Sequence, residues 1–368
     1  MAQLYFTSSL IPNKLFLSLE ELFEHIKHQE ILLVFDTNIV VYYRDFFLNS
    51  NKFITSNKST YYSIRYLVEQ ISRYDLEVNG TFGVEESSRS KSDFKLNMEK
   101  VYQTHRAVMS ILAMNIDSFD KFIKEDFSED EIKTNKDYPF SKIDSLKEES
   151  SFQNLHIISY LAALKIFILK NQIEENTITP SEAYLFFLDF VIEEVDCIAA
   201  TINQYALHLF GGVDFFKLIL MPKGNISIEE TLDQLFTGAI DLVYPTIVNK
   251  SQDLYPIPNK LEKMIPVLVT ADRRLATLHS RINTKFILET SSIKDGINYN
   301  PELTEIVFYE KTKWSKADLK LFNDRLTKDI EHRFISSISE GKTATHLLPL
   351  VEKYEQEVIT IVHNKLKN

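Results

Sequence analysis

The sequence predicts an α/β protein in which a central parallel sheet is flanked by helices, with a large helical insertion and a helical C-terminal extension. Two apolar runs, 31–35 (ILLVF) and 264–270 (MIPVLVT), show no alternation, which is typical of parallel strands buried on both faces. Only 8 of the 368 residues are Gly, whereas 26 are Phe and 17 are Tyr. This balance favours long helices that pack through aromatic side chains.

The composition excludes several classes of protein. A hydrophobic content of 44% is too high for a disordered chain. The single cysteine, Cys197, excludes an intramolecular disulfide framework and a Cys-based zinc finger, and it fits a reducing cytosol. Lys165 interrupts the most apolar stretch, and the first residues lack the basic segment of a signal peptide. We therefore expect a soluble, cytoplasmic protein without a membrane partner.

The formal net charge of −11 argues against a protein that coats nucleic acid, because non-specific affinity for phosphates comes from Lys and Arg. It does not exclude an enzyme with a local basic rim. Carboxylates that form an active site would themselves add negative charge.

The spacing of apolar residues predicts the order of the elements. The first part contains a helix after Ser18, a strand and a helix on either side of Asp36, and a short strand before the Asn79-Gly80 turn. The middle of the chain is helical, apart from a charged loop or linker at 125–151. Further strands are expected at 286–288 and 306–309, followed by amphipathic helices from Ser315 to the end. We therefore divide the chain into two parts of one core, 1–96 and 226–300, an insertion, 97–225, and an extension, 301–368.

Acidic residues follow both buried strands directly. Asp36 ends the first strand and Asp272 follows the second, each before a helix. Because ligands bind outside the carboxyl ends of strands in open α/β sheets, these acids are placed where chemistry is expected. Glu85 and Glu86 follow the next short strand, where local sequence alone favours a solvated helix start as their explanation. Asp241 borders the apolar stripe of a helix and has an ordinary boundary position as its alternative.

Several carboxylates gathered in one pocket raise one another's pKa and need a cation to remain ionised together. An oxygen-only ligand set favours Mg²⁺ or Mn²⁺ over zinc. Such ions lower the pKa of bound water and neutralise the charge that develops when a phosphodiester is attacked. The acids therefore indicate a substrate that carries phosphate.

These motifs resemble the PIN-domain nucleases. The resemblance rests on VFDTN at 34–38, the E-x-S-R segment at 86–89, a helical Asp and LVTADRRLA at 268–276, and it covers roughly 31–97 and 227–290. It implies a PIN-like core whose catalytic and metal-binding residues are Asp36, Glu86, Asp241 and Asp272, with Glu85 as the alternative in register. Asn38 and Thr270 match polar positions of the same motifs.

Three basic residues that follow the proposed acids are candidates for contact with phosphate: Arg89, Arg273 and Arg274. The polar Asn38 and Thr270 are further candidates for contact with the substrate. Solvated helix termini explain the arginines equally well. Tyr42 and its aromatic neighbours could stack on bases, although packing is the ordinary role for such residues.

The resemblance implies a metal-dependent nuclease that uses Mg²⁺ or Mn²⁺, with RNA favoured over DNA as its substrate. We expect an endoribonuclease acting on single-stranded or structured RNA in a toxin or defence context, with a regulatory protein partner or a homo-oligomer as open alternatives. A catalytically silent PIN-like RNA-binding or assembly module and a flap-endonuclease-like DNase also remain open. A haloacid-dehalogenase-like phosphatase is disfavoured, because Asn38 stands where that chemistry needs a second Asp.

Overall fold

The computed structural model describes residues 3–27, 29–124, 151–197, 199–214, 226–254, 264–289, 292–294, 297–299, 302–308, 311–335 and 344–367. The chain forms two compact units, each made from two separate segments. The first unit comprises Met1–Ser150 and Thr246–Arg281, and the second comprises Ser151–Pro245 and Ile282–Asn368. Of the predicted loop at 125–151, all but Ser151 lies outside the described residues.

The boundaries of these units differ from those predicted at 97, 226 and 301. Helix α6 (Met98–Leu112) packs against α2 (Thr37–Leu48) and α5 (Thr81–Ser87), so it belongs to the first unit. Helix α12 (Ile228–Asp241) packs against α8 (Ser151–Glu174) and α16 (Ala344–Lys367), so it belongs to the second. Long-range helix packing, which spacing along the chain does not reveal, sets both boundaries.

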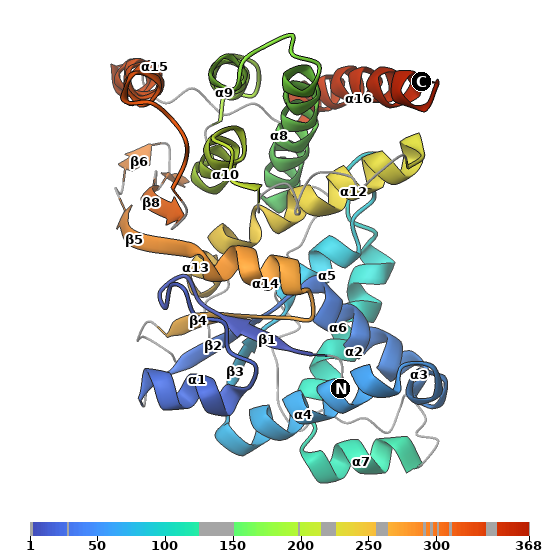
Figure 1. The fold of residues 1–368 in the computed structure, drawn as a ribbon. Helices are drawn as coiled ribbons and strands as arrows, with labels where there is room; N and C mark the ends of the chain where they lie inside the picture. The colour runs from blue at the N-terminus through green and yellow to red at the C-terminus, as the bar shows by residue number, and fades with distance from the viewer. Residues whose placement is uncertain are drawn as a thin grey trace. The chain divides into compact units, whose positions relative to one another are not determined.

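The first unit is built on a four-stranded, mostly parallel sheet with the order β1-β4-β2-β3 (Figure 1). Its strands are β1 (Tyr5–Thr7), β2 (Ile31–Phe35), β3 (Glu77–Asn79) and β4 (Ile265–Thr270). β2 runs parallel to both β3 and β4, whereas β1 pairs antiparallel with β4. The sequence predicts β2, β4 and, from the Asn79-Gly80 turn that follows it, the short β3, whereas β1 is not among the predicted strands.

The two central strands are buried on both faces. Every residue of β2 is buried, and so is all of β4 after its first residue. This is the environment that an apolar run without alternation predicts. In the central pair, Phe35 lies opposite Val269, so β2 and β4 end beside each other.

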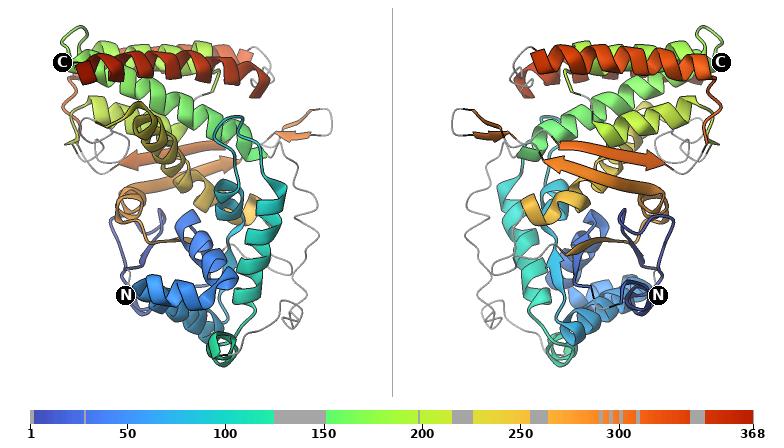
Figure 2. Two further views of the ribbon diagram at one scale, coloured as in Figure 1. Left: turned by 90° about the vertical axis from the view of Figure 1, so that its right-hand side faces the viewer. Right: turned by 90° about the vertical axis from the view of Figure 1, so that its left-hand side faces the viewer.

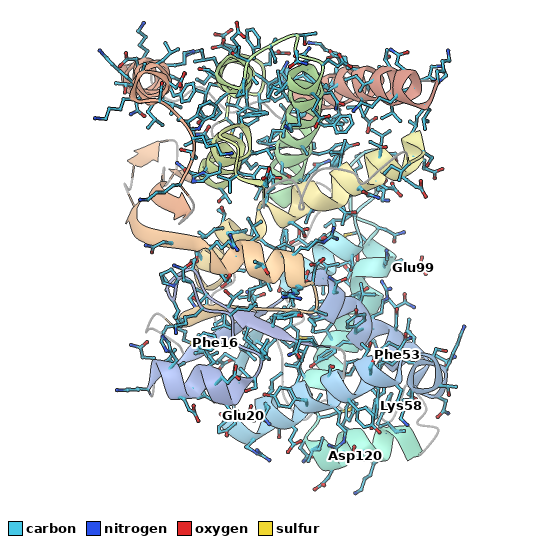
Figure 3. All side chains as sticks on the ribbon, viewed as in Figure 1. Phe16, Glu20, Phe53, Lys58, Glu99 and Asp120 are labelled. Atoms are coloured by element: carbon cyan, nitrogen blue, oxygen red, sulfur yellow. The ribbon has the colours of Figure 1, made fainter. Side chains whose placement is uncertain are left out.

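Helices cover the sheet of the first unit. Besides α2, α5 and α6 they are α1 (Leu19–Ile26), α3 (Ser50–Ser56), α4 (Lys58–Tyr74), α7 (Ile116–Lys124) and α14 (Arg273–Ser280). Phe46 of α2 stacks on Phe119 of α7 with ring centroids 4.9 Å apart. Asp120, labelled in Figure 3, accepts two hydrogen bonds from the guanidinium of Arg65 on α4. Aromatic packing thus joins these helices, as the composition predicts.

The second unit is largely helical. Its helices are α8, α9 (Pro180–Asp189), the π-helical turn η3 (Phe190–Glu194), α10 (Ala200–Phe210), α12, α15 (Lys316–Ile335) and α16. α13 (Tyr244–Leu254) starts at the end of this unit's first segment and continues in the first unit. α8 and α16 pack against each other, as both views of Figure 2 show. Complete capping boxes start α9 and α12, at Thr179 and Ser227.

The late strands predicted at 286–288 and 306–309 pair with each other rather than joining the sheet of the first unit. β5 (Ile282–Glu289) runs antiparallel to β8 (Glu302–Phe308), and β6 (Ser292–Lys294) pairs with β7 (Ile297–Tyr299). Tyr309 lies outside the described residues. None of the helices in the described ranges combines the length and the apolarity that crossing a membrane requires.

Candidate functional site

The candidate site lies where β2 and β4 end. Asp36 follows β2 directly, and its backbone N–H donates to the carbonyl of Val269 in β4 at 3.0 Å. This bond continues the β2–β4 pairing by one residue and fixes the backbone of Asp36 against β4. Asp36 is only 3% exposed, so its carboxylate is held inside the protein.

The hydroxyl of Thr270 connects the two acids predicted at this edge. Its Oγ1 donates to Oδ2 of Asp36 at 2.5 Å and accepts from the backbone N–H of Asp272 at 2.9 Å. Asn38 adds a second donor, because its Nδ2 lies 3.0 Å from the same Asp36 oxygen. Thr270 is fully buried, whereas Asn38 is exposed. Both predicted polar residues therefore orient Asp36.

The surroundings of Asp36 disfavour its charge. Burial raises the pKa of the Asp36 carboxyl, the hydrogen bonds from Thr270 and Asn38 oppose this change, and the charge of Asp272 raises it further. Burial, followed by the charges of Asp36 and Asp272, also raises the pKa of Tyr42. The phenol of Tyr42 is thus within the electrostatic influence of both acids. A buried carboxylate beside a like charge is a common feature of functional sites.

Asp272 is fixed by the start of α14. Its Oδ1 accepts from the backbone N–H groups of Arg274 at 2.6 Å and Leu275 at 3.2 Å, as an N-cap residue does. The guanidinium of Arg274 lies 3.7 Å from Oδ2 of Asp272, and the Asp272 side chain is 27% exposed. Arg273 and Arg274 are exposed. Two exposed arginines therefore lie beside Asp272, which agrees with either a contact with phosphate or a solvated helix start.

Close packing of α5 on the β2–α2 junction brings in the third acid. A Cβ on Gly83 would lie 2.8 Å from Cγ2 of Val40, 3.2 Å from the carbonyl oxygen of Phe35 and 3.3 Å from Cα of Thr37. Only Gly fits this approach without displacing backbone atoms. Glu86 lies three residues further along α5, on nearly the same face of the helix. The Thr37 hydroxyl donates to Oε2 of Glu86, which places this carboxylate beside the residue that follows Asp36.

The neighbouring acid, Glu85, faces the interior. Its side chain is 1% exposed and forms an ion pair with Arg89 at 3.2 Å, and Arg89 also donates to the carbonyl of Phe94 at 2.6 Å. The structure thus favours Glu86 over Glu85 as the acid of the site. The Arg89 side chain is equally buried, which counts against the predicted contact with phosphate.

Asp241 belongs to the second unit. It is the last residue of α12 and is half-buried. The site described within the first unit is therefore made of Asp36, Glu86 and Asp272.

Two residues that hold the site together are not among the sequence candidates. Thr37 links Glu86 to the start of α2, and Gly83 permits the approach of α5. A signal for Gly83 exists in the sequence, because Gly is rare in this chain and rarely favoured inside a helix. Thr37 stands within the quoted VFDTN motif, but a threonine after a strand has many ordinary roles.

The donor set suits a hard divalent cation. Asp36, Glu86 and Asp272 offer carboxylate oxygens only, and the burial of Asp36 beside another negative charge favours a compensating cation. Within the described residues, no three His, Cys, Asp or Glu side chains are already close enough together to form a ready metal site.

Comparison with known proteins gives no family assignment. No protein-family model matches the chain, and neither a curated protein nor a solved structure matches it. Any functional assignment must therefore come from the residues of the site.

Proposed function

We propose that the first unit is a PIN-like nuclease core and that the protein is a metal-dependent endoribonuclease. The observation that supports this most strongly is the connection from Asp36 through the Thr270 hydroxyl to the backbone of Asp272. It joins two acids at the carboxyl ends of adjacent parallel strands, where ligands bind in open α/β sheets. Glu86 supplies a third acid from a separate helix.

Each residue of the site has a distinct part in this function. Asp36, Glu86 and Asp272 would hold Mg²⁺ or Mn²⁺. When bound, the ion would lower the pKa of a water molecule and neutralise charge that develops on the phosphate. Asn38 and Thr270 keep the Asp36 carboxylate oriented, as outer partners of metal ligands do.

The exposed arginines at the start of α14 would bind the substrate. Arg273 and Arg274 occupy the first two positions of the helix, and their side chains are exposed beside Asp272. Guanidinium groups bind phosphate oxygens through paired hydrogen bonds. The preference for RNA over DNA rests on the resemblance to PIN-domain nucleases alone.

The decisive experiment is a cleavage assay with labelled single-stranded RNA, single-stranded DNA and a flap duplex, each with Mg²⁺ or Mn²⁺. The wild type is compared with Asp272→Asn, because Asn is an equally good N-cap and leaves α14 intact while removing the charge. Glu24→Gln, an exposed acid on α1, is the matched control.

We expect metal-dependent cleavage of RNA by the wild type and by Glu24→Gln, and a loss of at least about a hundredfold in Asp272→Asn. Cleavage by Asp272→Asn at the wild-type rate would refute the assignment. Binding of RNA without any products would instead identify a silent RNA-binding module, and cleavage of the flap duplex alone would identify a DNase.

A further inference from the structure

A lysine interrupts an apolar stretch of helix α8 in the second unit. Lys165 of α8 is half-buried, and its neighbours Leu164 and Ile166 are fully buried. Lysine is among the residues most costly to bury, because its ammonium group loses hydration. Its position therefore calls for an interaction that compensates the charge.

Two aromatic rings supply only part of that compensation. The Nζ of Lys165 lies 5.0 Å from the ring centroid of Tyr354 and 5.4 Å from that of Phe190. Such cation–π contacts contribute about 0.5–2 kcal/mol. Burial lowers the pKa of Lys165, and the charges of Glu194 and Glu357 act in the opposite direction. In the described part of the chain, no carboxylate oxygen lies within 4.0 Å of this ammonium group.

Three acids that line the same cavity as Lys165 have hydrogen-bond partners of their own. Both oxygens of Glu194 accept from the Tyr354 hydroxyl, at 2.7 and 2.9 Å, and Oε2 also accepts from Lys353 at 3.2 Å. Arg325 of α15 donates to Asp189 at 2.7 Å and to Glu193 at 2.8 Å. Each of these three carboxylates thus accepts a direct hydrogen bond from another side chain, whereas Lys165 has, among the described residues, only its two ring contacts and the more distant charges of Glu194 and Glu357.

The backbone beside these acids is irregular. α9 continues directly into the π-helical turn η3, in which the N–H of Val195 donates to the carbonyl of Phe190 five residues earlier, at 3.0 Å. Single π-helical turns within α-helices are rare and frequently occur at functional sites. The wider turn carries both the Phe190 ring and the carboxylates of Glu193 and Glu194.

A cavity of about 330 Å³ opens at this point. Lys165 and Gln172 line it with amine and amide groups, and Leu169, Phe186 and Phe190 provide apolar walls. Phe186 is 46% exposed, so part of this apolar wall has no cover in the unit. The volume falls at the small end of the range for ligand pockets.

We propose that the second unit binds a small organic monocarboxylate in this cavity, with the carboxylate at the Lys165 ammonium group and an apolar body against Leu169, Phe186 and Phe190. Asp189, Glu193 and Glu194 line the same cavity, so a polyanion would meet several negative groups. A single negative charge on an apolar body fits both the cation and the walls.

The test uses the full chain and three probes: benzoate, the similarly shaped but neutral benzyl alcohol, and AMP. Binding is measured by calorimetry and by ligand-observed NMR. The variant Lys165→Met removes the charge and keeps the length of the apolar stem. Lys170→Met is the matched control, because Lys170 lies on the same helix, pairs with Glu174 and does not line the cavity.

We expect millimolar or tighter binding of benzoate to the wild type and to Lys170→Met, and an affinity at least about tenfold weaker in Lys165→Met. Benzyl alcohol should bind weakly to all three proteins. Equal binding of benzoate to the wild type and Lys165→Met would overturn the proposal, as would no binding of benzoate at about 10 mM. AMP binding more tightly than benzoate would also overturn it, in favour of a nucleotide site.

Discussion

Acidic side chains lie at both the carboxyl ends and the amino ends of the strands in the first unit, but their burial and hydrogen bonding differ. At the carboxyl ends, Asp36 is 3% exposed and receives hydrogen bonds from Thr270 and Asn38. At the amino ends, Glu24 and Glu30 are exposed along a groove of about 740 Å³ that also contains the first residue of β3, Glu77. The groove at the amino ends is lined by more acids than the site at the carboxyl ends, but of these acids only Asp36 pairs near-complete burial with hydrogen bonds from Thr270 and Asn38.

The number of acidic side chains therefore does not by itself identify a functional site. A carboxylate in water costs little, so a protein can carry many on its surface without a function for any of them. A buried carboxylate beside a like charge lowers stability unless another interaction compensates it. The hydrogen bonds from Thr270 and Asn38 hold the Asp36 carboxylate in this unfavourable position. We therefore place the proposed function at the carboxyl ends of the strands.

The largest expected effect is a difference in cleavage and stability between substitutions of the adjacent Glu86 and Glu85. Glu86→Gln should lower metal-dependent cleavage at least about a hundredfold and leave the unfolding midpoint nearly unchanged, because Glu86 is only partly buried. Glu85→Gln should destabilise the first unit by about 3–5 kcal/mol, because it leaves the buried Arg89 without its ion-pair partner. Cleavage assays and urea unfolding of both variants, beside Glu24→Gln, measure the difference. The opposite pattern would reassign the site to Glu85.

The approach of α5 provides a second test. Gly83→Ala should destabilise the protein by about 1–3 kcal/mol and weaken metal binding, because the added methyl group pushes α5 and Glu86 away from the β2–α2 junction. Gly80→Ala is the matched control, since its Cβ would lie 3.6 Å from Val40 and Val108, an ordinary contact. Thermal unfolding with and without Mn²⁺ measures both effects. Equal behaviour of the two variants would show that the close approach does not position Glu86.

The orientation of Asp36 provides a smaller effect. Asn38→Ala removes one of the two side-chain donors to Asp36 Oδ2 and should weaken the affinity for Mn²⁺ by about tenfold, while Thr270 retains the carboxylate. Because Asn38 is exposed, stability without metal should change little. The affinity follows from the rise of the unfolding midpoint with Mn²⁺ concentration. An unchanged affinity would show that Thr270 alone orients Asp36.

The smallest expected effect is a dependence of stability on pH in the absence of metal. The folded-state pKa of Asp36 is raised, so the folded protein binds this proton more tightly than the unfolded chain does. The charged carboxylate therefore destabilises the protein above the folded pKa, and this cost disappears as pH falls toward the unfolded value of about 4. In EDTA, Asp36→Asn should be more stable than the wild type at pH 8 and lose that advantage at pH 4–5. Urea unfolding at both pH values measures the change, and a difference that grows on acidification would contradict it.

The sequence alone determined the two central strands of the first unit's sheet. Uninterrupted apolar runs predicted β2 and β4, because strands buried on both faces have no polar alternation. The acids that follow them, Asp36 and Asp272, could be located for the same reason. The capping signal at Ser18 likewise acts within a few residues, and the Ser18 side chain accepts from the backbone N–H of Glu21 at the start of α1.

Only the tertiary structure decided which neighbouring side chains serve the site. Glu85 and Glu86 cannot be distinguished from the sequence. The packing of Gly83 on Thr37 directs Glu86 toward the sheet edge and Glu85 into the core. The burial of Arg89 and the membership of Asp241 in the second unit were equally invisible, as was the irregular turn beside Lys165. Each depends on contacts between segments distant in sequence, and periodicity within one segment carries no information about them.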